Sequence, residues 1–258
     1  MLEELLELVR YRDLLGLLIS NHIKTRYRRS ALGVIWTLLN PLLTMSVMTI
    51  AFENLFQTTL KNYPVYILAG LLFWNFFAQS INAAMNSMVW GSSLLKRVYV
   101  PRTIFAVAII GHSLVNLGLG LIPLIVIMLL VAQPFSLALL FLPVAVILTV
   151  MFVLGLALFF STLAVFFTDV VDMFQVALTA WFYLTPVMYP AKILPDFYYQ
   201  YLYLNPAYSL LSLFRDPIYF GQLPEFNTLL AAVIFACLSL IVGWWFFTRK
   251  ADEFAYRL

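Results

Sequence analysis

Six apolar segments separated by short polar stretches dominate the hydrophobic pattern of this chain. They cover residues 34–56, 65–89, 104–131, 137–167, 170–186 and 229–247. A helix needs about 20 mostly apolar residues to cross the hydrocarbon core of a bilayer. The segments are continuously apolar rather than alternating, which favours spanning helices over the strands of a β-barrel. We therefore predict an all-α, polytopic membrane protein with six transmembrane helices in one domain, residues 1–258.

The composition supports a membrane protein. Of the 258 residues, 64% are hydrophobic and only 10% are charged, with a mean hydropathy of +0.96. A soluble domain carries about 25% charged residues, and an apolar excess of this size cannot fit inside one core that still needs a polar shell. Disordered, collagen-like, disulfide-stabilised and ordinary cytosolic proteins are thereby excluded. The single cysteine, Cys237, lies in an apolar segment and is expected to be a small buried or lipid-facing side chain.

The distribution of Lys and Arg predicts the orientation of the chain. Twelve of them lie before the first apolar segment, between the second and third, and after the sixth, whereas three lie in the opposite connections. Cytoplasmic loops are enriched in these residues, so both termini are predicted to be cytoplasmic. The acidic, mixed first residues do not resemble a cleaved signal peptide, and a net charge of +3 is too small to indicate a nucleic-acid partner.

An amphipathic segment, residues 10–33, precedes the first apolar segment. Apolar residues recur at helical spacing, and polar residues occupy much of the other face. The apolar set is Leu14, Leu15, Leu18, Ile19 and Ile23, and the polar set is Arg12, Asp13, Ser20, Asn21 and Lys24. The pattern predicts a helix lying in the inner interface of the membrane. Two roles stay open, which are simple anchoring on anionic lipids and docking of a partner protein.

The fifth apolar segment ends at Thr185 and Pro186, and an aromatic stretch follows. Pro190 and Pro195 block helix continuation, and six of the residues 197–208 are Phe or Tyr. We predict short re-entrant helices that cap the outer face, with a simple aromatic interface belt as the alternative. Before the segment, Asp169-Val-Val-Asp172 has the form of a capping box, which predicts a structural role for both carboxylates.

Sequence signatures of catalysis are absent. The chain contains no P-loop, no HExxH, no cysteine pair for zinc and no GxSxG. Carboxylates are missing from the centres of the apolar segments, which disfavours ion-coupled transport. His112 and Asn116 are expected to hydrogen-bond across helices, with substrate contact as the minority alternative. The row Asn75, Gln79, Asn82 and Asn86 suits helix contact or a wet cavity.

Four features together resemble a known family. First, a basic amphipathic helix leads into RRSALGVIWTLLNPLL (28–43), and second, LLKRVYVPR (94–102) follows the second apolar segment. Third, a short turn before the fifth apolar segment contains Asp169, and fourth, TPVMYP, LNP and an Arg lie within 185–215. This order is similar to that of ABC-2-type permeases that export polysaccharides such as O-antigen and teichoic acid. Family members often carry Arg before the Asp of the turn, whereas this chain has Phe167 and Thr168, so a charge pair at that point is not expected.

The resemblance implies a half-transporter. Two copies would form a continuous channel in the bacterial inner membrane, and two separate P-loop ATPase subunits would bind the ATP and Mg that this chain does not bind. The segments implied are an interface helix 10–33, spans one to five within 34–189, a periplasmic gate region 190–222, span six 229–247 and a cytoplasmic tail 248–258. ATPase contact is implied for Lys24, Arg26, Arg28, Arg29, Leu95, Lys96, Arg97, Tyr99 and Pro101.

A lipid-linked polysaccharide needs a walled path, because each unpaired hydroxyl in hydrocarbon costs several kcal/mol. Aromatic rings on spans one and five are candidates for that wall. The channel candidates are Trp36, Phe52, Phe56, Phe174, Leu178, Trp181, Phe182 and Thr185, and the gate candidates are Tyr198, Tyr199, Tyr201, Tyr203 and Tyr208. Exporters of teichoic acid, a drug or a lipid stay open as alternatives. A stand-alone channel or carrier is less favoured, and an intramembrane enzyme is the weakest alternative.

Overall fold

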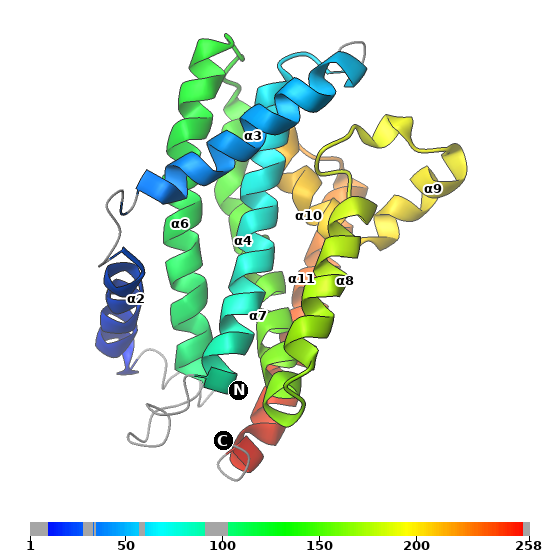
Figure 1. The fold of residues 1–258 in the computed structure, drawn as a ribbon. Helices are drawn as coiled ribbons and strands as arrows, with labels where there is room; N and C mark the ends of the chain where they lie inside the picture. Colours follow the sequence, from blue (N-terminus) through cyan, green and yellow to red (C-terminus); the bar gives the residue numbers. More distant parts are fainter. Residues whose placement is uncertain (1–9, 28–32, 34, 57–59, 91–102, 255–258) are drawn as a thin grey trace.

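A computed structural model with side chains describes residues 10–27, 33, 35–56, 60–90 and 103–254 (Figure 1). Within these ranges every regular element is a helix, which confirms the predicted all-α class. Most of the residues predicted to contact the ATPase lie outside the described ranges. They are Arg28, Arg29, Leu95, Lys96, Arg97, Tyr99 and Pro101.

Five helices are long and apolar enough to cross a membrane. They are α3 (Ile35–Phe56), α4 (Tyr63–Trp90), α6 (Thr103–Leu130), α7 (Leu142–Phe166), which continues from η1 (Leu137–Phe141), and α11 (Phe226–Lys250). The remaining predicted span forms α8 (Val170–Leu184), which has only 15 residues. At 1.5 Å per residue it rises about 22 Å, so by length alone the described chain offers five spans rather than the predicted six.

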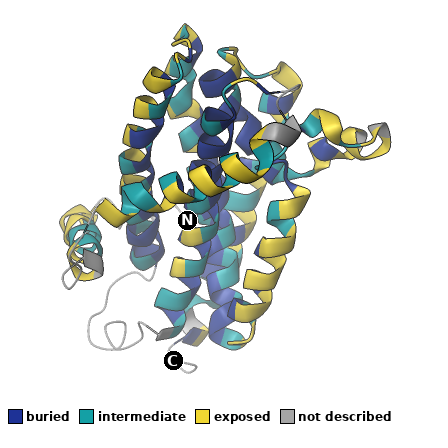
Figure 2. Cartoon of the chain, turned by 45° about the horizontal axis from the view of Figure 1, so that its top comes forward, coloured by how far each residue is buried: buried dark blue, intermediate teal, exposed yellow. Residues whose placement is uncertain are grey.

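Helix α4 is the centre of the bundle. In its most apolar window 78% of the residues are buried, compared with 11% in α3 and 22% in α11. Helices α3, α6, α7 and α8 all pack against α4, and α3 crosses the bundle obliquely with one side exposed (Figures 1 and 2). The core is therefore built around one helix, and the others keep an outward face that is apolar.

Helices α7 and α11 pack closely because both carry glycine at their contact. A Cβ on Gly155 would lie 2.2 Å from the backbone of Ser239, and one on Gly243 would lie 1.9 Å from the Gly155 carbonyl oxygen. The Ser239 hydroxyl donates to the carbonyl oxygen of Phe152 at 2.9 Å. Small residues let membrane helices approach at backbone distance, so this pair forms one unit.

Helix α2 (Arg12–Tyr27) forms within the segment predicted to be an amphipathic helix. The predicted apolar set, Leu14 and Ile19 among it, is half-buried, whereas Leu17 and Lys24 are exposed. A Cβ on Gly111 of α6 would lie 2.7 Å from the end of the Ile19 side chain, so the apolar face meets α6. The described helix is thus held by packing on a neighbouring helix.

Two polar predictions are corrected by the local geometry. Asn116 and the His112 ring are 3.2 Å apart within α6, one turn from each other, so the pair lies inside one helix instead of joining two. The His112 ring also lies 6.2 Å from that of His22 on α2. Asp169 is the N-cap of α8, but its backbone is already helical and its side chain makes no capping hydrogen bond.

Short helices gather at the end of the bundle opposite the end of α11 (Figure 1). They are η2 (Ala191–Ile193), α9 (Asp196–Tyr201), η3 (Leu202–Leu204), α10 (Pro206–Arg215) and the π-helical turn η4 (Asp216–Phe220). We call this end of the bundle the outer end, after the orientation that the distribution of Lys and Arg predicts.

Candidate translocation groove

One face of α4 carries a row of carboxamides although most of the helix is buried. Asn75, Gln79, Asn82 and Asn86 are spaced by three or four residues and so share a side of the helix. Gln79 is exposed and the other three are half-buried. Asn75, Gln79 and Asn82 line cavities, which supports the wet-cavity interpretation for these three, whereas the Asn86 amide donates to the carbonyl oxygen of Asn82 at 2.8 Å.

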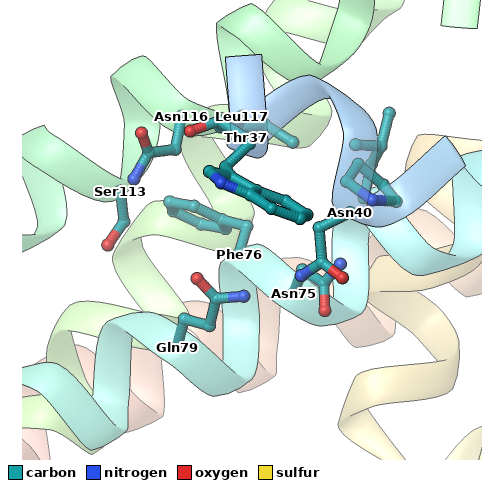
Figure 3. A pocket seen from close by; sticks show the side chains of 11 residues that line it. Thr37, Asn40, Asn75, Phe76, Gln79, Ser113, Asn116 and Leu117 are labelled. Carbon is teal, nitrogen blue, oxygen red and sulfur yellow. The ribbon is translucent and has the colours of Figure 1, made fainter. Parts of the chain in front are cut away.

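The first cavity lies between α3, α4 and α6 and has a volume of about 180 Å³. Figure 3 shows Asn40 from α3, Asn75 and Gln79 from α4, and Ser113 and Asn116 from α6 around it. Apolar and aromatic side chains complete the lining, which also includes Trp36, Thr37, Pro41, Leu72, Phe76 and Leu117. Polar groups from three helices thus converge at one place between apolar elements.

A second cavity, of about 420 Å³, lies between α4 and α8. Asn75 and Asn82 face it from α4, and Gln175 and Thr179 face it from α8. Aromatic side chains flank these polar groups, and they are Trp74, Phe182 and Tyr183. The edge of α8 that faces this cavity is therefore polar and aromatic, whereas the rest of its exposed side carries Met173, Val176 and Leu184.

Asn75 lines both cavities, so they are neighbours along one surface. We call this surface the carboxamide groove: its floor is the amide row of α4, and its sides are α3 and α8. The buried Oδ1 of Asn82 has no hydrogen-bond partner within the described chain. Buried polar atoms are normally hydrogen-bonded, so the groove offers an acceptor to water or to cargo.

The aromatic face predicted on the fifth segment points inward. Phe174 is buried and its ring lies 4.3 Å from that of Phe160 on α7. The Trp181 ring contacts Phe77 of α4 at 5.2 Å. Leu178 is also buried. Phe174 and Trp181 therefore pack against the bundle, whereas Leu178 and Phe182 line the second cavity, so cargo contact by this face stays a prediction.

Trp181 and Thr185 serve a hydrogen-bonded junction with Asn205. The Trp181 indole N–H donates to the Asn205 side-chain oxygen at 2.8 Å, and the Asn205 amide donates to the Thr185 hydroxyl at 3.0 Å. The same Asn205 oxygen accepts from the Ala207 N–H at 3.1 Å, which caps α10. In the sequence, Asn205 and Pro206 form a turn signal, which predicts neither the Trp181 contact nor the Thr185 contact.

The remaining channel candidates lie in different surroundings. Trp36 is 49% exposed and lines the first cavity, and half-buried Phe182 lines the second. The Phe182 ring also lies 5.3 Å from that of Trp74. Phe52 is half-buried against the core, and the side chain of Phe56 lies outside the described parts. Contact with cargo stays a prediction for Trp36 and Phe182.

The backbone between α8 and η2 is irregular, and side chains from α4 and α10 satisfy its carbonyls. Tyr63 donates to the carbonyl oxygen of Met188 at 2.7 Å, and Tyr66 to that of Tyr189 at 2.9 Å. Buried Arg215 donates to the carbonyl oxygen of Pro186 at 2.8 Å and lies 4.0 Å over the Tyr66 ring. Non-helical backbone at membrane depth is tolerated where protein groups satisfy it.

The predicted gate tyrosines belong to the short helices of the outer end. Tyr198 and Tyr201 are mostly exposed, Tyr199 and Tyr203 are just over a third exposed, and Tyr208 is half-buried. Burial raises the pKa of Tyr208 to about 12, with Tyr199 adding to the rise. On the other side of the molecule, Lys24 is exposed on α2, and the side chain of Arg26 is outside the described parts.

Several spanning-length helices around a polar groove define a multi-pass membrane protein of the transport class. The family model of ABC-2 type transporters matches residues 13–219, and the chain belongs to this family.

The chain is 30% identical over 251 residues, 96% of either chain, to the O-antigen export system permease protein RfbA of Myxococcus xanthus. It is 27% identical to RfbA of Klebsiella pneumoniae over 94% of either chain. Identity to the polysialic acid transport protein KpsM of Escherichia coli is 22%, over 88% of this chain and 89% of that one.

Proposed function

We propose that this chain is the permease subunit of an ATP-driven exporter that moves a lipid-linked, O-antigen-like polysaccharide across the bacterial inner membrane. The observation that carries the proposal is the carboxamide groove on a chain whose relatives are named for O-antigen export and polysialic acid transport. Amides both donate and accept hydrogen bonds, so a row of them suits the hydroxyl groups of a sugar chain.

The groove chemistry favours a polymer of sugars over a drug or a lipid. Gln79 and Thr179 present polar groups without charge, and Trp36 and Phe182 present ring faces. Neutral amides along a helix bind sugar hydroxyls weakly and at repeated positions. Weak binding lets the polysaccharide move along the groove, because conduction requires release from each site. An apolar cargo would gain nothing from the amide row.

The complete channel requires a second copy of the chain. Helix α3 is only 11% buried in its apolar window, and it exposes Leu43, Val47 and Ile50. In the proposed homodimer such faces meet the other copy or lipid, and the two grooves face one shared path. Helix α8 serves as the sixth span together with the segment that follows it, whose carbonyl oxygens accept hydrogen bonds from Tyr63, Tyr66 and Arg215. The short helices of 190–222 close the path on the periplasmic side.

Energy comes from a partner. The sequence has no P-loop, so a separate cytoplasmic ATPase binds ATP and Mg. Both termini lie in the cytoplasm, where the basic end of α2 and residues 91–102 dock on that ATPase. Closure of two ATPases on ATP then moves α2 and, through its packing on Gly111, moves α6 beside the groove.

Export of surface polysaccharide in a deletion strain tests this function. Restoring the wild-type gene is expected to restore the polysaccharide on the cell surface, whereas Gln79→Leu combined with Asn82→Leu is expected to leave it inside the cell. Leu230→Ala, an exposed apolar position on α11, is the matched control and should complement fully. Normal surface polysaccharide in the deletion strain would refute the function, and normal export by the double variant would refute the groove.

A further inference from the structure

A third cavity, also polar in character, lies at the outer end, away from the carboxamide groove. It has a volume of about 350 Å³ and is bounded by α4, η2, α9, η3, α10, η4 and the start of α11. We call it the outer pocket. Its size falls in the range of small-molecule sites, about 300–1,000 Å³.

The floor of the outer pocket is built from buried polar side chains. Ser212, Arg215 and Thr228 are each at least 94% buried and all line it. Arg215 is fixed by its bonds to the carbonyl oxygens after α8 and by the Tyr66 ring. Its Nε is nevertheless buried without a hydrogen-bond partner among the described residues. Such a donor is costly to leave unpaired, so hydrogen-bonding capacity is left unused at the floor of the pocket.

The rim combines tyrosine rings with hydrogen-bonding groups. Tyr199 and Tyr203 line it and are each just over a third exposed, and Gln222 and Glu225 lie on the same rim. The π-turn η4 ends at Gly221 in the left-handed conformation, held by a hydrogen bond from the Ser136 hydroxyl to the Gly221 carbonyl oxygen at 2.7 Å. Gln222 is therefore presented by a fixed turn.

The two carboxylates of the pocket are not neutralised by ion pairs. In the described part of the chain the ion pairs join Arg12 to Asp13 and Lys250 to Glu253, and neither involves Asp216 or Glu225. Burial raises the pKa of Asp216 to about 6, an effect that Arg215 opposes and Glu225 increases. Both carboxylates are acceptors that a hydroxyl-rich ligand can use.

We propose that the outer pocket is a carbohydrate-binding site that holds one sugar residue of the exported chain as it leaves the groove. This rests on the proposed function. Tyr199 and Tyr203 stack on the apolar face of the ring, while Asp216, Gln222 and Glu225 accept or exchange hydrogen bonds with its hydroxyls. Binding at this site stabilises the exported part of the polysaccharide outside the membrane and so opposes its return.

Other ligand classes fit the pocket less well. The pocket lining carries two carboxylates, Asp216 and Glu225, and two cations, Lys192 and Arg215. An anionic phosphate would meet the carboxylates, and a divalent cation would meet the two cations. A lipid tail would leave the polar floor unpaired. A neutral sugar satisfies donors and acceptors together and uses the ring faces, which are the groups that the pocket presents.

Titration calorimetry on the purified permease with its partner ATPase in lipid nanodiscs tests the site. The probe is a set of short oligosaccharides released by mild acid from the surface polysaccharide of the source strain. Wild type should bind them saturably, and Tyr203→Ala and Gln222→Ala should each weaken binding about tenfold. Gln222 is exposed, so its replacement leaves folding intact.

Two matched controls lie outside the pocket. Phe226→Ala removes an aromatic ring that is 74% exposed next to Glu225, and Glu53→Gln removes an exposed carboxylate on α3. Both should bind as wild type does. Calcium chloride and glycerol phosphate are titrated as competing ligand classes. Saturable binding of either of these without binding of the oligosaccharides overturns the assignment, as does equal affinity in the pocket variants and wild type.

The outcomes separate this inference from the proposed function. If deletion of the gene abolishes surface polysaccharide but the wild-type complex binds no oligosaccharide, the outer pocket is refuted while the export function stands. If deletion leaves the polysaccharide in place, the proposed function is refuted, and the pocket inference that depends on it is refuted with it.

Discussion

Replacing Asn205 with alanine removes three interactions at once. The side chain caps α10 through the Ala207 N–H, accepts from Trp181 at 2.8 Å and donates to Thr185 at 3.0 Å. Loss of an N-cap costs about 1 kcal/mol, and each neutral side-chain hydrogen bond contributes about 1 kcal/mol. We therefore expect Asn205→Ala to lower the free energy of unfolding by about 3 kcal/mol.

Thermal unfolding of the purified complex measures this loss. For a chain of this length 1 kcal/mol corresponds to about 2–4 °C, so Asn205→Ala should melt about 6–12 °C lower than wild type. Asn205→Asp is the matched control, because a carboxylate accepts from Trp181, from the cap N–H and from the Thr185 hydroxyl, which can rotate to donate. It should melt within about 2 °C of wild type.

A double-mutant cycle assigns the loss to the junction. Trp181→Phe keeps a ring against Phe77 but removes the indole donor. If the junction is the cause, Asn205→Ala and Trp181→Phe together should cost less than the sum of the two single changes. Additive losses, or an Asn205→Asp variant as unstable as Asn205→Ala, would refute the reasoning.

Three further substitutions test other parts of the structure. Arg215→Met removes the charged donor to the carbonyls after α8 and should destabilise the complex by about 3 kcal/mol in thermal unfolding; Arg215→Lys should not rescue it, because an ammonium lacks the planar fork. Gly155→Ala places a Cβ 2.2 Å from the backbone of Ser239 and should cost about 1–3 kcal/mol, whereas Gly118→Ala, with no atom within 4 Å of its Cβ, should be neutral. The pKa of Asp216 is raised from 3.8 to about 6, so the protonated carboxyl group stabilises the folded chain. This stabilisation is fully present below pH 3.8 and is lost as the pH rises through about 6. Asp216→Asn should therefore have a higher free energy of unfolding than wild type near neutral pH, by up to about 3 kcal/mol. It should melt at a higher temperature there, and the difference should vanish in acid.

Hydropathy predicted the membrane class because a bilayer requires long apolar helices whose backbone groups are satisfied internally. The amphipathic helix α2 and the turn at Asn205 and Pro206 were also visible, since helical periodicity and turn residues are local signals. The amide row of α4 could be read from its spacing. Its partners across the groove, Gln175 and Thr179, carried no comparable signal and were missed.

Which side of α8 faces outward was decided by tertiary packing. The aromatic residues Phe174 and Trp181 could equally have lined a channel or a core, because an aromatic ring suits both. The aromatic surface of α4 and α7 determined the outcome, because it covers those rings and leaves Gln175 and Thr179 exposed on another side of α8.

The sequence by itself thus determined that the chain is a helical membrane protein, and by motif order it pointed to the ABC-2 family. The tertiary structure decided which residues share a cavity, because Arg215, Tyr66 and the segment after α8 are far apart along the chain and meet only when α10 packs on α4. Contacts between distant segments depend on the shapes of all helices together, and no local pattern encodes them.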